Sequence, residues 1–154
     1  MASQTGRTTK QWVAFLIDDS GGTLRNIPVN SVNGVGLEYE EADVTAFTDA
    51  IVNVLPGTPD LTIEIAGPFD NTASTGSHTV LSGIVGGSTP LSMDIQVGIR
   101  HAWESGEPQF GITSSSTSGM LCTKYTVDME NMAYSATFKV MGGTAPAWGT
   151  TAET

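Results

Sequence analysis

The sequence predicts an all-β protein, a mainly antiparallel β-sandwich or barrel with one short flanking α-helix. The clearest strand is residues 91–99, L-S-M-D-I-Q-V-G-I, where every odd position is apolar and every even position is small or polar. This period of two indicates a strand with one dry face, because a helix would scatter the apolar side chains around its axis. Charged residues make up only 14% of the chain, whereas glycine, serine and threonine are abundant. This composition favours strands and turns.

The amino-terminal part is expected to form an arm followed by a hairpin. Residues 1–10 are polar and without periodicity, so we predict an arm that is disordered unless a neighbour orders it. W-V-A-F-L-I at 12–17 is apolar on both faces, which is typical of a strand buried in the core or at a subunit contact. Residues 18–22, D-D-S-G-G, favour a turn, and 23–27 return as the partner strand.

The middle of the chain is expected to hold a second clear strand and the only helix. Residues 36–47 alternate weakly and carry four acids, and 53–60 are predicted to be a loop because they contain two prolines and a glycine. L-T-I-E-I-A at 61–66 is a clean alternating strand. Residues 77–85 place apolar side chains at helical spacing.

The remaining segment predicts a long loop and a closing pair of strands. Residues 101–119 are rich in glycine and serine, so we expect either a functional loop or one that contains a short strand pair. Residues 122–141 alternate as two strands joined near 130–132. At 154 residues, the chain has the length of a single domain. The predicted parts are an arm, one β-sandwich domain and a tail: 1–10, 11–142 and 143–154.

Charge and cysteine content exclude several classes of protein. The formal net charge is −10 and the isoelectric point is near 4.3, so the average surface repels phosphate and specific nucleic-acid binding is not expected. The single Cys122 cannot form an internal disulfide, and we expect it to be a buried structural thiol. No apolar leader or membrane-length apolar run is found in the sequence, which predicts a protein made and folded in the cytoplasm of its host cell, without a membrane partner.

The sequence does not predict an enzyme. It contains no nucleophile elbow, phosphate-binding loop, C-x-x-C or H-E-x-x-H motif, and it has only two histidines. We therefore expect no catalytic residues, no cofactor and no metal site. The turn at 18–22 lacks the ligand spacing of a calcium loop. The acidic group at 38–43 is compatible with a divalent-ion site, the wall of a negative channel or a solvated strand edge.

The tryptophans point to protein contacts. Trp103 and Trp148 lie in segments that are too polar to bury a large ring easily, and aromatic side chains in loops and tails are typical anchors of interfaces. The alternative is that each ring folds back onto its own sheet. With Trp12 on the strand that is apolar on both faces, the predicted inter-subunit contacts are Trp12, Trp103 and Trp148.

One family shares this order of strands and turns. The chain runs through I-D-D-S-G-G-T-L-R-N-I and V-N-S-V, then E-A-D-V-T-A-F-T-D, a Pro-Gly loop, L-T-I-E-I-A-G-P-F-D-N-T, a short helix and Y-S-A-T-F-K-V-M-G. From about Phe15 to Gly142, this pattern resembles the small tail tube (major tail) proteins of long-tailed, non-contractile bacteriophages.

The resemblance implies an assembly of many identical subunits. In that family each subunit contributes strands to a continuous inner β-barrel of a hexameric ring, the helix lies outside, and the rings stack into a hollow tube through which DNA passes. Here it assigns the helix to 77–85, the arms to 1–10 and 142–154, and the ring-to-ring loop to either 44–59 or 101–119.

We therefore predict a structural virion protein, a self-assembling tail tube subunit located in the virion tail and assembled in the host cytoplasm. Its partners are further copies of itself and other tail proteins, and DNA passes without specific binding because a lumen lined by carboxylates and small hydroxyls repels phosphate. The side chains expected to face the lumen are Ser92, Asp94, Gln96, Glu64, Glu38 and Glu40. The alternatives are a capsid decoration (cement) or head-to-tail connector protein and, with less support, a carbohydrate-binding β-sandwich.

Overall fold

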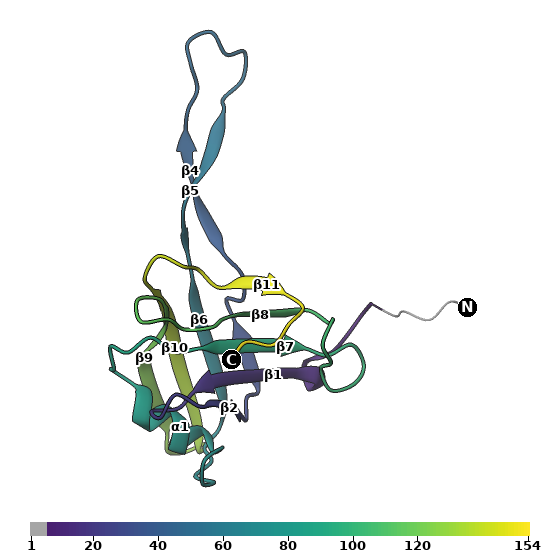
Figure 1. Ribbon diagram of the computed structural model, residues 1–154, viewed down its shortest axis with the longest axis vertical. Coiled ribbons are helices and arrows are strands. Elements are labelled where there is room, and N and C mark those ends of the chain that lie inside the picture. Colours follow the sequence, from purple (N-terminus) through teal and green to yellow (C-terminus); the bar gives the residue numbers. More distant parts are fainter. Residues whose placement is uncertain (1–5) are drawn as a thin grey trace, which may run out of the picture.

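The fold is described from a computed structural model, in which residues 6–154 are placed (Figure 1). Residues 1–5 of the predicted arm lie outside the described residues. The elements in chain order are η1 (Lys10–Trp12), β1 (Val13–Asp18), β2 (Leu24–Ile27), β3 (Ser31–Asn33), β4 (Glu38–Asp43), β5 (Val54–Asp60), β6 (Thr62–Pro68), α1 (Ser77–Ile84), β7 (Met93–Val97), β8 (Gln109–Ile112), β9 (Gly119–Asp128), β10 (Ala133–Met141) and β11 (Ala147–Gly149).

Two antiparallel sheets face each other and enclose one hydrophobic core. The five-stranded sheet has the order β11-β8-β7-β1-β2 and the four-stranded sheet the order β3-β6-β10-β9. Their strands cross steeply, as Figure 1 shows, which is one of the two common ways for sheets to pack. Phe15 of β1 meets Phe138 of β10 across the core, with ring centroids 5.5 Å apart. The predicted fold class, all-β with one short flanking helix, is confirmed.

Helix α1 closes one end of the sandwich, where the sequence predicts it. Val80, Leu81 and Ile84 point into the core, while the opposite face of the helix is exposed. The start of the helix is fixed by Ser77, whose hydroxyl donates to the carbonyl of Pro68 at 2.9 Å and accepts from the amide of Asp70 at 3.1 Å. The helix is thereby tied to the end of β6.

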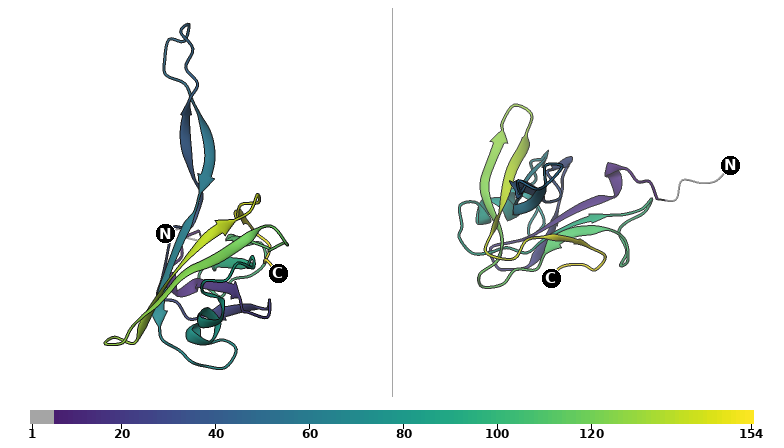
Figure 2. Two further views of the ribbon diagram at one scale, coloured as in Figure 1. Left: turned by 90° about the vertical axis from the view of Figure 1, so that its left-hand side faces the viewer. Right: turned by 90° about the horizontal axis from the view of Figure 1, so that it is seen from above.

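The β4–β5 hairpin leaves the body of the molecule. Both strands project away from the two sheets, with the loop 44–53 at the far end (Figures 1 and 2). The prediction of a loop at 53–60 is wrong, because this segment forms β5. Prolines at 56 and 59 are compatible with a strand here, since a two-stranded hairpin leaves one edge of each strand unpaired and needs no donor there.

The end of the chain folds back onto the five-stranded sheet. Residues 147–149 form β11, which pairs with β8, and β8 itself lies within the predicted long loop at 101–119. Residues 150–154, here called the carboxyl-terminal strap, then cross the outer face of that sheet. Glu153 donates its backbone N–H to Asp94, and Thr113 donates its hydroxyl to the Glu153 carboxylate at 2.6 Å.

This strap corrects the expectation for the strand at 91–99. Its inner side chains are buried as predicted, with Met93 and Ile95 at 0% and 1% exposure. The expectation of a wet outer face is wrong for Ser92 and Asp94, which are 2% and 0% exposed. The strap covers this face, so β7 is covered on both sides although its sequence has the period of a half-exposed strand.

No described helix is long and apolar enough to cross a bilayer.

Candidate assembly surfaces

Most of the exposed large apolar side chains among the described residues lie on the β4–β5 hairpin. Phe47 is fully exposed. Its exposed apolar companions on the same hairpin are Tyr39, Val44, Ile51, Val52, Val54 and Leu55. A cluster of this kind is a candidate contact surface, because soluble monomeric proteins rarely expose large contiguous apolar patches.

Hydrogen bonds give the hairpin tip a defined shape. The carboxylate of Asp49 accepts the amide of Ala46 at 2.7 Å and the side-chain amide of Asn53 at 3.0 Å. The hydroxyl of Thr45 accepts the amide of Asn53 at 2.8 Å. The loop is therefore closed by its own polar side chains, and the apolar ones are left to face outward. Below the tip, the stem is acidic, with Glu38, Glu40, Glu41 and Asp43 exposed.

The outer face of the four-stranded sheet is a second open surface, and it is polar. Glu64 of β6 lies between Asn33 of β3 and Thr137 of β10 in the strand register. Alternation along the strands places the following polar side chains on the same face: Ser31, Asn33, Thr62, Glu64, Ser135, Thr137, Lys139, Lys124, Thr126 and Asp128. Both signs of charge occur here, so the face is hydrophilic without a strong net charge.

The four-stranded sheet also has an unpaired edge. Strand β9 is one outer strand, and only its first half is covered, by bridges from Leu91 to Met120 and from Val85 to Cys122 and by a hydrogen bond from the Gly86 amide. Within the described chain, no strand pairs with the outer side of residues 124–128. An edge of this kind is a template for a strand of another chain.

The six side chains predicted to face a lumen do not share one surface. Glu64 lies on the outer face of the four-stranded sheet, and Glu38 and Glu40 lie on the projecting hairpin. The other three, Ser92, Asp94 and Gln96, belong to the five-stranded sheet. In the described subunit the burial of Ser92 and Asp94 removes them from any channel surface, for the reason given above.

The buried carboxylate of Asp94 is only partly satisfied. Its Oδ2 accepts the side-chain amide of Gln96 at 2.8 Å and the backbone amide of Glu153 at 3.3 Å, while Oδ1 has no partner. Removal from water raises the pKa of Asp94 above its ordinary value, and the nearby Glu153 carboxylate adds to the shift. The strap thus rests on a buried acid that is harder to ionise than the same group in water.

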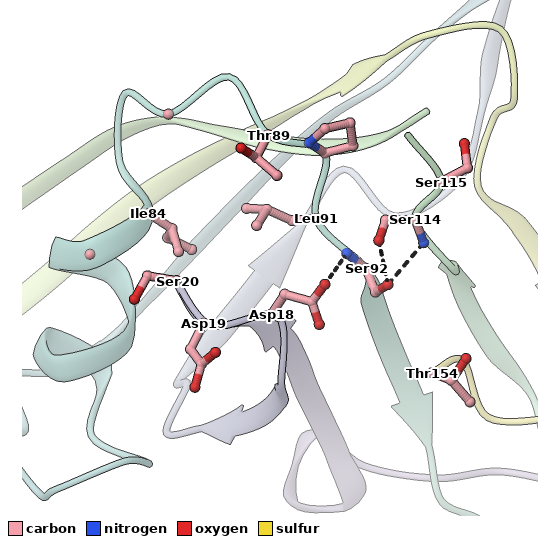
Figure 3. A pocket seen from close by; sticks show the side chains of 14 residues that line it. Asp18, Asp19, Ser20, Ile84, Thr89, Leu91, Ser92, Ser114, Ser115 and Thr154 are labelled. Atoms are coloured by element: carbon pink, nitrogen blue, oxygen red, sulfur yellow. Dashed lines mark hydrogen bonds between the residues drawn. The ribbon is translucent and has the colours of Figure 1, made fainter. Parts of the chain in front are cut away.

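A pocket of about 420 Å³ lies where the β1–β2 turn, the end of α1 and the start of β7 meet (Figure 3). Asp18 Oδ2 accepts the amide of Ser92 at 2.8 Å. The Ser92 hydroxyl donates to the Ser114 hydroxyl at 3.0 Å and accepts the Ser114 amide at 2.8 Å. No histidine, lysine or arginine lines this pocket, and the carboxyl groups of Asp18 and Asp19 are its titratable side chains.

The tryptophans and the cysteine occupy different environments. The Trp103 indole donates to the carbonyls of Glu107 and Pro108, both at 3.1 Å, and so folds back onto its own loop. Trp148 is 57% exposed and lies against Phe110, with ring centroids 5.1 Å apart. Trp12 is half-buried at the end of η1, directly before β1, and lines a surface pocket together with Trp103. Their role in subunit contacts stays a prediction.

The buried thiol expected at position 122 is confirmed. Cys122 is 1% exposed, and burial raises its pKa to about 11. A thiol with so high a pKa is almost entirely protonated at neutral pH and is a poor nucleophile.

Comparison with known proteins identifies the fold. No family model and no curated protein matches the sequence. Among solved structures, the chain is similar to the sheath/tube terminator of the PVC extracellular contractile injection system in its extended state, with a TM-score of 0.60, 12% identity and coverage of 96% of this chain and 99% of that one. It also resembles a chain of the PVC sheath-tube complex in the extended state, with a TM-score of 0.56, 12% identity and coverage of 94% and 92%.

A third similar structure is the anti-feeding prophage cap, described as the AFP tube terminating cap. Its TM-score is 0.56 at 12% identity, with coverage of 97% of this chain and 95% of that one. At this identity the likeness shows a fold shared with these three chains and no more. The sequence pointed to long-tailed, non-contractile phages, and that narrower assignment finds no support, because these neighbours come from contractile injection systems.

Proposed function

We propose that this protein is a structural, non-enzymatic subunit at the tube of a phage or phage-like injection apparatus. The observation that carries the proposal is the fold shared with a sheath/tube terminator over nearly the whole length of both chains. In this function copies of the subunit close into a ring, hexameric as in the resembling family, and the rings stack. The other parts of the tail and further copies of the chain are its partners.

Ring closure is assigned to the four-stranded sheet. The free outer side of β9 at 124–128 pairs with an edge of the next copy, and the sheet continues from subunit to subunit. Its hydrophilic outer face, with Glu64 near its centre, then lines the channel. A hydrophilic wall whose lysines are balanced by carboxylates has no excess of positive charge, so a polyanion such as DNA passes without being held.

Ring stacking is assigned to the β4–β5 hairpin. Of the two segments that the sequence left open, 44–59 projects from the body, whereas 101–119 contributes β8 to the sheet and is folded around Trp103. The apolar tip at Phe47 enters a contact with the adjacent ring, which removes it from water.

A terminator that caps the tube is the second candidate, because two of the similar structures are terminating proteins. Negative-stain electron microscopy of the purified protein separates the two functions. Tubes of uniform bore support a tube subunit, and single rings that do not stack support a terminator. If the protein stays monomeric at high concentration and forms neither tubes nor rings, the proposal is overturned.

A further inference from the structure

The loop between β7 and β8 gathers a mixed set of metal-ligating side chains. One ligand atom from each of His101, Glu104 and Glu107 lies within 4.8 Å of the other two. The sequence predicted no metal site, because it has only two histidines and lacks the recognised metal-ligand motifs. The folding of the loop brings them together.

The loop is held in shape by Glu107. Its Oε2 accepts the amide of Ile99 at 3.0 Å and its Oε1 accepts the amide of Glu104 at 2.9 Å. The indole of Trp103 donates to the carbonyls of Glu107 and Pro108. One ligand of the set is therefore positioned before any ion arrives, which lowers the cost of binding.

The two carboxylates have no strong cation beside them. Among the described residues, neither Glu104 nor Glu107 forms an ion pair with lysine or arginine. The imidazole beside them is that of His101, whose Nδ1 lies 3.5 Å from Glu107 Oε1 and 2.8 Å from the carbonyl oxygen of Ala102. An ion pair between His101 and Glu107 alone does not require Glu104, yet its carboxylate faces the same point. Two anions that converge on one imidazole favour a bound cation.

We propose that His101, Glu104 and Glu107 bind a divalent transition-metal ion, with Zn²⁺ as the representative. One imidazole nitrogen with two carboxylate oxygens suits such ions, whereas Ca²⁺ and Mg²⁺ favour oxygen ligands alone. Three protein ligands leave a coordination position for water or for a group on a neighbouring protein. This site is independent of the proposed function.

Isothermal titration calorimetry of Zn²⁺ into metal-free, full-length protein tests the proposal. We expect one site, and at least about tenfold weaker binding in the variants His101→Ala and Glu104→Gln. Glu107 is left unchanged because its carboxylate also holds the loop backbone. The matched control is His78→Gln, which alters the other histidine, bonded to Tyr125 on another part of the surface, and should leave Zn²⁺ affinity unchanged.

A thermal shift provides the second measurement. Zn²⁺ should raise the unfolding temperature of the natural protein and of His78→Gln, but not that of His101→Ala. Equal Zn²⁺ affinity in the natural protein and His101→Ala overturns the site. So does Ca²⁺ binding as tight as Zn²⁺ binding, since that result would describe an acidic surface without an imidazole ligand.

Discussion

Replacing Phe47 by serine tests whether the hairpin tip joins one ring to the next. In the subunit this ring is fully exposed and supports nothing else, so its removal should leave the free energy of unfolding within about 0.5 kcal/mol of the natural value. Any larger effect must come from contacts between subunits. The tip thus separates assembly from folding.

The size of the effect follows from the area that the contact would bury. Burying a phenylalanine side chain contributes about 1.5–3 kcal/mol. The variant should therefore weaken the stacking free energy by roughly that amount for each subunit in the contact. The protein concentration needed for stacking should then rise by about 10- to 150-fold. With several hairpins per ring, the loss for a whole ring is correspondingly larger.

Sedimentation and negative-stain microscopy over a concentration series measure this shift, and circular dichroism checks that the variant is folded. The matched control is Met129→Ser, which removes an apolar side chain that is 72% exposed at the β9–β10 turn, away from the hairpin. It should assemble like the natural protein. If Phe47→Ser stacks at the natural concentration, the hairpin tip does not form the ring-to-ring contact.

Three further predictions concern the subunit itself. Because the folded-state pKa of Asp94 is raised above 3.8, the folded state binds its proton more tightly than the unfolded state does, and this group costs stability as pH rises from about 4 through that folded pKa. In urea unfolding, the unfolding free energy of Asp94→Asn relative to that of the natural protein should increase as the pH rises through this range. A difference between the two proteins that does not change with pH would contradict the assigned pKa shift. Phe138→Ala opens a cavity at the centre of the sandwich and should lower the unfolding free energy by about 3–5 kcal/mol in the same assay; a loss below 1 kcal/mol would mean that the ring is not in the core. Cys122 should resist a thiol reagent at pH 8 in the native protein and react after unfolding in urea, whereas rapid native labelling would show that the thiol is reachable.

Sequence patterns located the strands and the helix whose formation depends on local side-chain chemistry. The strand at 61–66 and the helix at 77–85 appear close to their predicted bounds, because period-two and helical apolar spacing report which side of each element is buried. The β5 strand was missed. Its prolines are typical of a loop, and an isolated two-stranded hairpin accommodates them because both of its strands are edge strands.

Local sequence patterns predicted the candidate surfaces less well than they predicted the strands and the helix. The acids at positions 38, 40, 64 and 94 have similar neighbours in sequence, yet they lie on a hairpin, an open sheet face and a covered sheet face. The metal-ligating group at 101, 104 and 107 has no periodicity at all, and a loop closed by Trp103 and Glu107 creates it. Long-range contacts decide such sites, and they leave no local pattern.

The sequence by itself determined that this protein is an acidic, all-β sandwich with one helix and a buried cysteine, since composition and apolar spacing depend only on neighbouring residues. Tertiary structure alone decided which surfaces face outward. The outer side of β7 has the alternation of a wet strand, but Glu153, 59 residues beyond Asp94, lies over it. Whether a polar strand face meets water depends on what the rest of the chain brings to it, and no local period contains that information.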